Sequence, residues 1–282
     1  METTKVSTSF KIGNELEVNR LGYGAMQLTG RGIFGDPIDR ESAKKVLVSA
    51  VEQGVNFIDT AEAYGPQTNE SLIADALFPY HKSDILIATK GGFERPGPDK
   101  WVINGDPKFI SENIEGSLKR LKVKTIDLWQ LHRVDTKVPL EDTLAPVVEA
   151  VKAGKIRHVG LSEVNVKQIE RAEKVLPIVS VQNIYNLGNR QWEEVLNYTA
   201  QRGMAFIPWY PLASGPDKLQ QKISKIANRY GATVAQIALA WLLRRSENIL
   251  LIPGTKSIDH LKENIDSKRV ELSDEDFEEL SK

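Results

Sequence analysis

The sequence predicts a (β/α)8 barrel of the TIM type, preceded by a β-hairpin and formed by a single domain that spans residues 1–282. Short runs rich in β-branched and aromatic residues alternate with segments whose apolar residues recur at helical spacing, and eight strands can be counted in this way. No Pro- or Ser-rich linker divides the chain. Such regular alternation favours one barrel, whereas a doubly wound sheet, the alternative, usually has fewer strands in this length.

The hairpin is expected at residues 7–20, which alternate weakly around Gly13-Asn14. Residues 21–26 predict the first barrel strand, whose glycines indicate either a close approach by a ligand or by backbone, or a bulge. Asp106-Pro107 is typical of an N-cap followed by proline in the first helical turn. The other strands are expected at residues 55–60, 85–90, 126–132, 156–161, 178–182, 204–209 and 249–252. Helices are expected at residues 40–54, 68–78, 107–121, 140–153, 165–175, 189–202, 217–230, 233–245 and 257–266.

Two glycine-rich segments are expected to be loops. Residues 30–35 match GxGxxG by letter, but this pattern binds dinucleotides when it opens a helix directly after a strand. Here Asp36-Pro37 follows, so a loop over the rim of the barrel is expected instead. Residues 91–107 are rich in Gly and Pro and predict a long irregular loop, and loops of this length are usually functional.

Composition excludes several classes of protein. The net charge of -1 and the pI of about 6.5 argue against a nucleic-acid binder. The chain has no cysteine, which excludes disulfides, thiolate catalysis and Cys-ligated zinc. Its four histidines, at positions 81, 132, 158 and 260, are scattered, so no metal site is expected. With no apolar run of membrane-spanning length and no apolar signal core near the N-terminus, a cytoplasmic protein without membrane contact is expected.

Three successive strands end on a chemically reactive side chain. They finish on Asp59, Lys90 and His132, and Tyr64 follows the first of them in a loop. In a parallel barrel the carboxyl ends of the strands share one rim, where active sites are built. Taken alone, each residue has an ordinary explanation as a cap, a solvated charge or a satisfied hydrogen-bonding group. The repeated use of the same position favours a carboxylate, an ammonium, an imidazole and a phenol meeting at one site.

Such a group suits reduction of a carbonyl by hydride, because the alkoxide must be protonated as it forms. A phenol can supply that proton if its pKa falls toward neutrality, and a nearby ammonium acts in that direction. On this hypothesis Tyr64 is the acid and Lys90 lowers its pKa. Asp59 holds Lys90, and a neutral His132 orients the substrate oxygen.

The motifs resemble those of the aldo-keto reductase family. Residues 59–65 read Asp-Thr-Ala-Glu-Ala-Tyr-Gly, and the matches continue in family order over nearly the whole chain. The further matches are Lys90, His132, 160–162, 181–183, 209–212, 252–255 and 263–264. Residues 22–27 and 160–163 look most like the pyridoxal-reductase-like bacterial branches. The resemblance implies a barrel that binds NADPH across its rim and reduces an aldehyde or ketone, with pyridoxal as a candidate small-molecule substrate.

The resemblance also assigns the cofactor site by position. Ser162 and Gln182 are expected to hydrogen-bond the nicotinamide carboxamide, and Trp209 takes the place of the ring-stacking aromatic residue. Taken alone, Ser162 could equally be a helix cap and Trp209 a core aromatic. The remaining implied cofactor residues are Gly24, Pro211, Leu212, Gly254, Thr255, Lys256, His260, Glu263 and Asn264. Met26 and Trp101 are the candidates for the substrate pocket, although Trp101 could be an incidental loop aromatic.

Two positions depart from the family pattern. Glu163 follows Ser162 where many members have Asn, which puts one carboxamide contact in question although a carboxylate can still accept a hydrogen bond. Gly254, Thr255 and His260 replace the Lys-Ser and Arg that many members use for the adenosine phosphate. The start of the helix expected at residues 257–266, together with Lys256, is the expected substitute, because a helix N-terminus offers free N–H groups to phosphate.

Two alternatives remain open at this point. A cofactor-binding regulatory partner, like the potassium-channel β subunits that resemble this family, would keep the cofactor residues and tolerate slow chemistry. A lyase or isomerase barrel would use Lys90 to form a Schiff base, but its company of Asp59 and Tyr64 argues against that role.

Overall fold

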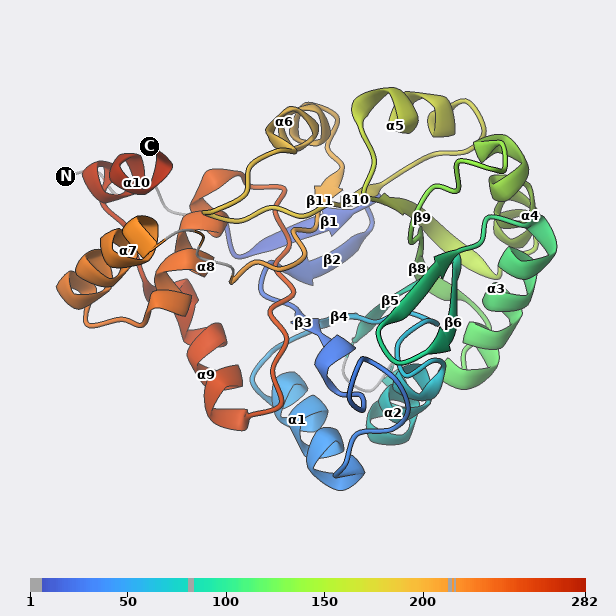
Figure 1. Ribbon diagram of the computed structural model, residues 1–282, viewed down its shortest axis with the longest axis horizontal. Coiled ribbons are helices and arrows are strands. Elements are labelled where there is room, and N and C mark those ends of the chain that lie inside the picture. The colour runs from blue at the N-terminus through green and yellow to red at the C-terminus, as the bar shows by residue number, and fades with distance from the viewer. Residues whose placement is uncertain (1–6, 81–83, 213–214, 216) are drawn as a thin grey trace.

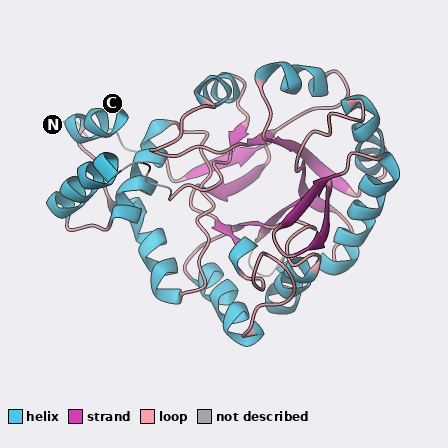
Figure 2. Cartoon of the chain, in the orientation of Figure 1, coloured by secondary structure: helices cyan, strands magenta, loops and turns pink. Residues whose placement is uncertain are grey.

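A computed structural model shows a closed barrel of parallel strands surrounded by helices (Figures 1 and 2). The structure describes residues 7–80, 84–212, 215 and 217–282. His81 therefore lies outside the described residues. Seven strands form one parallel sheet in the order β11-β10-β9-β8-β5-β4-β3. They are β3 (Tyr23–Gly24), β4 (Phe57–Asp59), β5 (Leu86–Gly91), β8 (Ile126–Leu131), β9 (Ile156–Ser162), β10 (Ser180–Gln182) and β11 (Ala205–Phe206).

The segment 249–252 closes the ring between the two edges of this sheet. Ile249 bridges to Phe206 of β11, and Leu251 bridges to Leu21 just before β3, both in parallel. Leu251 N donates to Arg20 O at 2.8 Å, and Gly22 N donates to Leu251 O at 2.8 Å. The expected eighth strand is thus present as single bridges, and the (β/α)8 barrel is confirmed.

Helices cover the outside of the barrel. Buried apolar residues lie inside the barrel and also between its strands and the helices. The helices are α1 (Arg40–Glu52), α2 (Thr68–Leu77), α3 (Pro107–Leu121), α4 (Leu140–Lys152), α5 (Val166–Glu173), α6 (Glu193–Gln201), α7 (Asp217–Tyr230), α8 (Val234–Arg245), α9 (Ile258–Asp266) and α10 (Asp274–Ser281). Asp106 caps α3 by accepting from Lys108 N and Phe109 N, with Pro107 in the first turn, as expected. The expected helices agree with these to within a few residues, except that α6 starts later than residue 189 and α10 was not expected.

The predicted N-terminal hairpin closes the opposite end of the barrel from the site. Its strands β1 (Ser9–Ile12) and β2 (Leu16–Asn19) pair antiparallel around Gly13-Asn14, and both turn residues have a positive φ. Ile12 and Val18 are fully buried and pack in one cluster with residues of the barrel strands such as Phe57 and Leu128. This apolar plug leaves the carboxyl ends of the strands as the open rim.

The segment expected as an irregular loop is instead a second hairpin. Strands β6 (Phe93–Gly97) and β7 (Lys100–Ile103) pair antiparallel between β5 and α3. The prediction was wrong because Pro98-Asp99, which looks like a loop, forms only the turn, where Asp99 has a φ of 56°. The hairpin stands over the rim and carries Trp101.

The expected strand at residues 21–26 is also shorter than predicted. Only Tyr23 and Gly24 form β3, and residues Ala25–Gln27 turn into a 3-10 helix. A Cβ on Gly24 would lie 2.5 Å from the carbonyl oxygen of Ile252. Of the explanations open for this glycine, the close approach of backbone is the one observed.

Candidate active site

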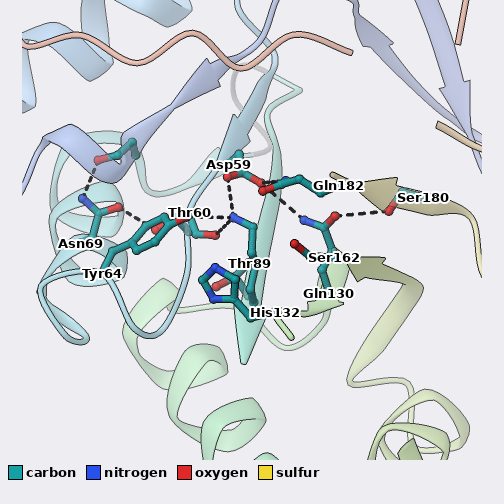
Figure 3. A network of polar contacts seen from close by, with 12 residues as sticks. Asp59, Thr60, Tyr64, Asn69, Thr89, Gln130, His132, Ser162, Ser180 and Gln182 are labelled. Carbon is teal, nitrogen blue, oxygen red and sulfur yellow. Dashed lines mark hydrogen bonds and ion pairs between the residues drawn. The ribbon is translucent and has the colours of Figure 1, made fainter. Parts of the chain in front are cut away.

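The four predicted side chains meet at the rim of the barrel. Figure 3 labels three of them, Asp59, Tyr64 and His132. Lys90 Nζ lies 2.6 Å from Asp59 Oδ1, donates to Thr60 O at 2.8 Å and lies 3.5 Å from Tyr64 Oη. The rings of His132 and Tyr64 are 5.8 Å apart, edge to face. Each comes from the position that the sequence indicated, at or just beyond the end of β4, β5 or β8. Lys90 is wholly buried, and the other three are at most 6% exposed.

The ion pair between Lys90 and Asp59 keeps the lysine charged inside the protein. Burial alone would lower the pKa of Lys90, but the charge of Asp59 and the neighbouring Tyr64 raise it, and the net direction is upward. A lysine must be neutral to attack a carbonyl and form a Schiff base. The surroundings of Lys90 disfavour that neutral form.

The acidity of Tyr64 differs from the expectation. Burial raises the pKa of the phenol above its ordinary value, although the positive charge of Lys90 acts in the opposite direction. The expected fall toward neutrality is therefore wrong for this state of the site, because desolvation outweighs the ammonium. Tyr64 is held as a protonated phenol.

His132 is held in the neutral form that was expected. Burial and then the positive charges of Lys90, Arg133 and Arg95 lower its pKa well below the ordinary value. Its Nδ1 is buried without a hydrogen-bond partner among the described residues. A neutral imidazole of this kind can donate or accept one hydrogen bond toward a molecule in the site.

Asp59 also organises the neighbouring polar groups. Its second oxygen, Oδ2, accepts from Gln182 Nε2 at 2.8 Å and from Gln130 Nε2 at 3.4 Å (Figure 3). Because an ionised carboxylate only accepts hydrogen bonds, this contact fixes the orientation of the Gln182 amide. Its Oε1 is turned away from Asp59 and can accept a hydrogen bond from elsewhere.

A cavity of about 600 Å³ opens beside this cluster. Of the predicted residues, those that line it are Gly24, Met26, Asp59, Tyr64, Trp101, His132, Ser162, Gln182, Trp209, Pro211, Leu212 and Gly254. Lys90 lies directly behind Asp59 and Tyr64. The Trp101 and Tyr64 rings lie edge to face, with the centroids 6.4 Å apart. The structure therefore places Trp101 and Met26 at the cavity, where the sequence analysis put them.

Ser162 ends β9 and meets a residue that the sequence analysis missed. Arg133 Nη1 donates to Ser162 Oγ at 3.0 Å and to His132 O at 2.6 Å, and Arg133 lines the cavity. The signal was available, since Arg133 is a charged residue directly after the strand end at His132. Other lining residues that were missed are Gln27, Ile33, Phe93, Tyr210, Ile252 and Pro253.

Glu163, which stands where many family members have Asn, hydrogen-bonds residues of this chain. Its Oε1 accepts from Trp209 Nε1 at 2.7 Å and from Ile184 N at 2.6 Å, and its Oε2 accepts from Trp192 Nε1 at 3.3 Å. Glu163 is not among the residues that line the cavity. It fixes the indole of Trp209 at the cavity wall.

The other predicted cofactor residues lie just before α9 or along it. The chain runs from Gly254 at the cavity into this helix, where Lys256 and His260 are exposed and Asn264 is buried. Thr255 Oγ1 accepts from Ser257 N, and Ser257 Oγ caps His260 N. Glu263 accepts a hydrogen bond from Thr233 at the cap of α8. Residues 255–257 thus form a short path of chain from Gly254 at the cavity to the helix N-terminus.

No group of three or more His, Cys, Asp or Glu side chains is arranged to hold a metal ion within the described ranges. No described helix is both long enough and apolar enough to span a membrane.

The fold and the site together define a (β/α)8 barrel that carries a buried acid–base cluster on the rim used by enzymes of this architecture. A sequence model of the Aldo/keto reductase family matches residues 20–282, and the chain belongs to this family. The resemblance drawn from the motifs is thereby confirmed.

Three similar proteins match this chain over nearly its whole length. An uncharacterized oxidoreductase of Schizosaccharomyces pombe is 49% identical over 274 residues, covering 96% of this chain and 88% of the relative. Pyridoxine 4-dehydrogenase of Escherichia coli is 40% identical over 275 residues, covering 95% and 96%. The crystal structure of an aldo/keto reductase from Klebsiella pneumoniae in complex with NADP and acetate superposes with a TM-score of 0.82 at 26% identity, covering 98% and 95%.

Proposed function

We propose that this protein is an NADPH-dependent oxidoreductase that reduces an aldehyde or ketone to the alcohol, with Tyr64 as the proton donor. One observation carries the proposal: a buried, charged Lys90 lies between Asp59 Oδ1 at 2.6 Å and the protonated phenol of Tyr64 at 3.5 Å, at the edge of a cavity. The family membership and the oxidoreductases among its relatives support it.

The residues at the cavity suit a nicotinamide carboxamide, which offers one acceptor oxygen and an N–H donor group. Arg133 donates into Ser162 Oγ, which leaves the serine hydroxyl proton free to donate. Asp59 accepts a hydrogen bond from Gln182 Nε2, which leaves Gln182 Oε1 free to accept one from a ligand. This donor and acceptor match the carboxamide, so Ser162 and Gln182 are the proposed contacts.

The rest of the cofactor would extend along the path to α9. Trp209, fixed by Glu163, offers a flat ring beside the carboxamide contacts, with Pro211, Leu212 and Gly24 around it. The first-turn amides of α9 and the exposed Lys256 suit the adenosine phosphate. Thr255 precedes this helix and His260 lies in its first turn, while Glu263 and Asn264 lie further along it. The Klebsiella pneumoniae relative with bound NADP supports NADP(H) as the cofactor.

The chemistry divides between cofactor and protein. The cofactor supplies the hydride that reduces the carbonyl carbon. Tyr64 donates its proton to the carbonyl oxygen, which becomes the alcohol hydroxyl, and the Lys90 ammonium stabilises the phenolate that remains. A raised pKa keeps the donor protonated at neutral pH, and an alkoxide is basic enough to take the proton from it. Neutral His132 hydrogen-bonds the same oxygen and orients it.

Pyridoxal is the first substrate to test, because the Escherichia coli pyridoxine 4-dehydrogenase is similar over nearly its whole length. A regulatory partner with slow chemistry would not need the complete Asp59, Tyr64, Lys90 and His132 cluster beside an open cavity.

The test is NADPH oxidation at 340 nm against an aldehyde panel that includes pyridoxal, for the wild type and for Tyr64→Phe. The variant is expected to lose about 10²-fold or more in kcat, the range of general-acid catalysis, while fluorescence titration shows unchanged NADPH binding. Tyr64→Phe with near-wild-type kcat would exclude Tyr64 as the acid. Absence of turnover by the wild type, together with tight NADPH binding, would favour the regulatory function.

A further inference from the structure

Arg133 is a cation built into the wall of the cavity. It is partly buried, and its guanidinium carbon lies 5.7 Å from the centroid of the Phe93 ring and 5.8 Å from that of Trp209. Nη1 is fixed by His132 O and Ser162 Oγ. The side chain is therefore held beside the reacting group of residues and not left to move freely in solvent.

The charge of Arg133 is not neutralised by an ion pair within the part of the chain that the structure describes. Its hydrogen bonds to described residues both come from Nη1. By contrast, Arg95 places Nε, Nη1 and Nη2 on three backbone carbonyls, and Arg120 pairs with Glu70 at 2.7 Å. Glu163, the acid that acts most strongly on Arg133, already accepts hydrogen bonds from Trp209 and Ile184. Nε and Nη2 remain for a ligand.

Removing a cation from water is costly unless a partner compensates it. A guanidinium that faces a cavity with two donor groups unused is suited to an anionic oxygen, because its planar fork binds a carboxylate or phenolate well. Arg133 lines the same cavity as Tyr64 and His132, and its hydrogen bonds to His132 O and Ser162 Oγ hold it at the reacting end of that cavity. The carboxamide of the proposed cofactor is neutral and does not supply the missing charge.

We propose that Arg133 forms an anion-binding subsite for the substrate, so that the protein prefers aldehydes carrying a carboxylate or phenolate oxygen near the carbonyl. This inference rests on the proposed reductase function and specifies its substrate class. Pyridoxal, whose ring carries an ionisable hydroxyl next to the aldehyde, falls within that class.

The experiment compares two pairs of aldehydes of nearly equal shape, 3- and 4-carboxybenzaldehyde against 3- and 4-nitrobenzaldehyde. For each pair the readout is the ratio of kcat/KM for the carboxylate to kcat/KM for the nitro compound, so a general loss of activity cancels. Arg133→Gln is expected to lower the ratio about tenfold or more in at least one pair, the size of a lost charged hydrogen bond. Arg133→Lys should give an intermediate ratio. Arg157→Gln, which removes an exposed arginine outside the cavity, should leave the ratio unchanged.

A second measurement does not need turnover. Calorimetric titration with benzoate and with benzamide, in the presence of saturating NADP, should show that Arg133→Gln loses the preference for benzoate. If the wild type reduces no aldehyde but prefers benzoate through Arg133, the reductase proposal fails and the anion subsite stands. Ratios within twofold of the wild type in both pairs, with unchanged benzoate binding, would overturn the subsite. A rise in the NADPH Kd with no change in the ratios would also overturn it and assign Arg133 to the cofactor.

Discussion

Single side chains at the rim show how burial and charge compete. The Lys90 ammonium and the Tyr64 phenol are both enclosed, yet Asp59 keeps the lysine charged while the phenol stays protonated. From sequence, the ammonium was expected to dominate and to lower the pKa of the phenol. Sequence alone does not give the burial of Tyr64, because its depth depends on Trp101 and Phe93, which the β6–β7 hairpin brings over the site.

His132 gives a pH prediction whose sign follows from its lowered pKa. In the unfolded chain its imidazole takes up a proton near pH 6.5, whereas the folded protein holds it neutral to well below that pH. Stability is therefore expected to be unaffected by His132 above about pH 7. Below about pH 6.5 the free energy of unfolding should fall, by up to about 1.4 kcal/mol per pH unit, until the folded pKa is reached.

Urea unfolding of the wild type and His132→Asn at pH 8, 7, 6 and 5.5 checks this expectation. The variant should be less stable overall but should lose less stability between pH 7 and pH 5.5. The interval from pH 8 to pH 7 is the internal control, where both proteins should show the same slope. Parallel curves over the whole range would contradict a buried neutral imidazole at this position.

At the scale of elements, Arg95 of β6 ties three segments around Tyr64. Its Nε donates to Lys100 O, Nη1 to Ala63 O at 2.7 Å and Nη2 to Gly32 O at 2.9 Å. The guanidinium also stacks on the Trp101 ring, 3.5 Å from its centroid. Ala63 directly precedes Tyr64. Arg95 therefore positions the phenol by joining the β6–β7 hairpin to the two rim loops that contain Ala63 and Gly32.

On the proposed function, replacing Arg95 by Met is expected to lower kcat about tenfold, because the phenol loses its fixed place while Asp59, Tyr64, Lys90 and His132 all remain. The effect should appear in kcat more than in the Kd for NADPH. Assays well below the melting temperature separate it from simple instability. Arg31→Met removes an exposed arginine from the rim loop that contains Gly32. This variant is the matched control and should keep kcat. Equal kcat values for Arg95→Met and the wild type would refute the positioning role.

The elements also show which parts of the site can be predicted from the amino-acid sequence. Asp59, Lys90 and His132 could be placed together because strand ends share a rim whatever the details of packing. The β6–β7 hairpin could not be recognised, since residues 93–103 contain two prolines and pairs such as Phe93 with Ile103 form only across the turn. Helix α10 was missed because Phe277 and Leu280 are nearly its only apolar residues. The use of Glu163 depended on Trp192 and Trp209, which are distant in sequence.

For the whole molecule, the segment that closes the barrel also forms part of the cavity wall. Segment 249–252 joins β11 to the region before β3, and its continuation brings Ile252, Pro253 and Gly254 to the cavity. The two sides of this seam approach closely, because a Cβ on Gly24 would lie 2.5 Å from Ile252 O and one on Gly254 would lie 2.7 Å from Gly24 O. Only glycine permits this backbone contact at either position.

Gly24→Ala is therefore expected to weaken the fold and the cofactor site together. Opening the seam should cost about 1–3 kcal/mol, the usual range for overpacking, and lower Tm by several degrees. On the proposed function it should also raise the Kd for NADPH, so saturating NADPH would raise the variant's Tm less than that of the wild type. Thermal unfolding with and without NADPH measures both effects. Gly97→Ala is the control, since its Cβ would meet only Lys100 at 3.8 Å. A Gly24→Ala protein with lowered Tm but the full NADPH-dependent gain would show that closure and cofactor binding are independent.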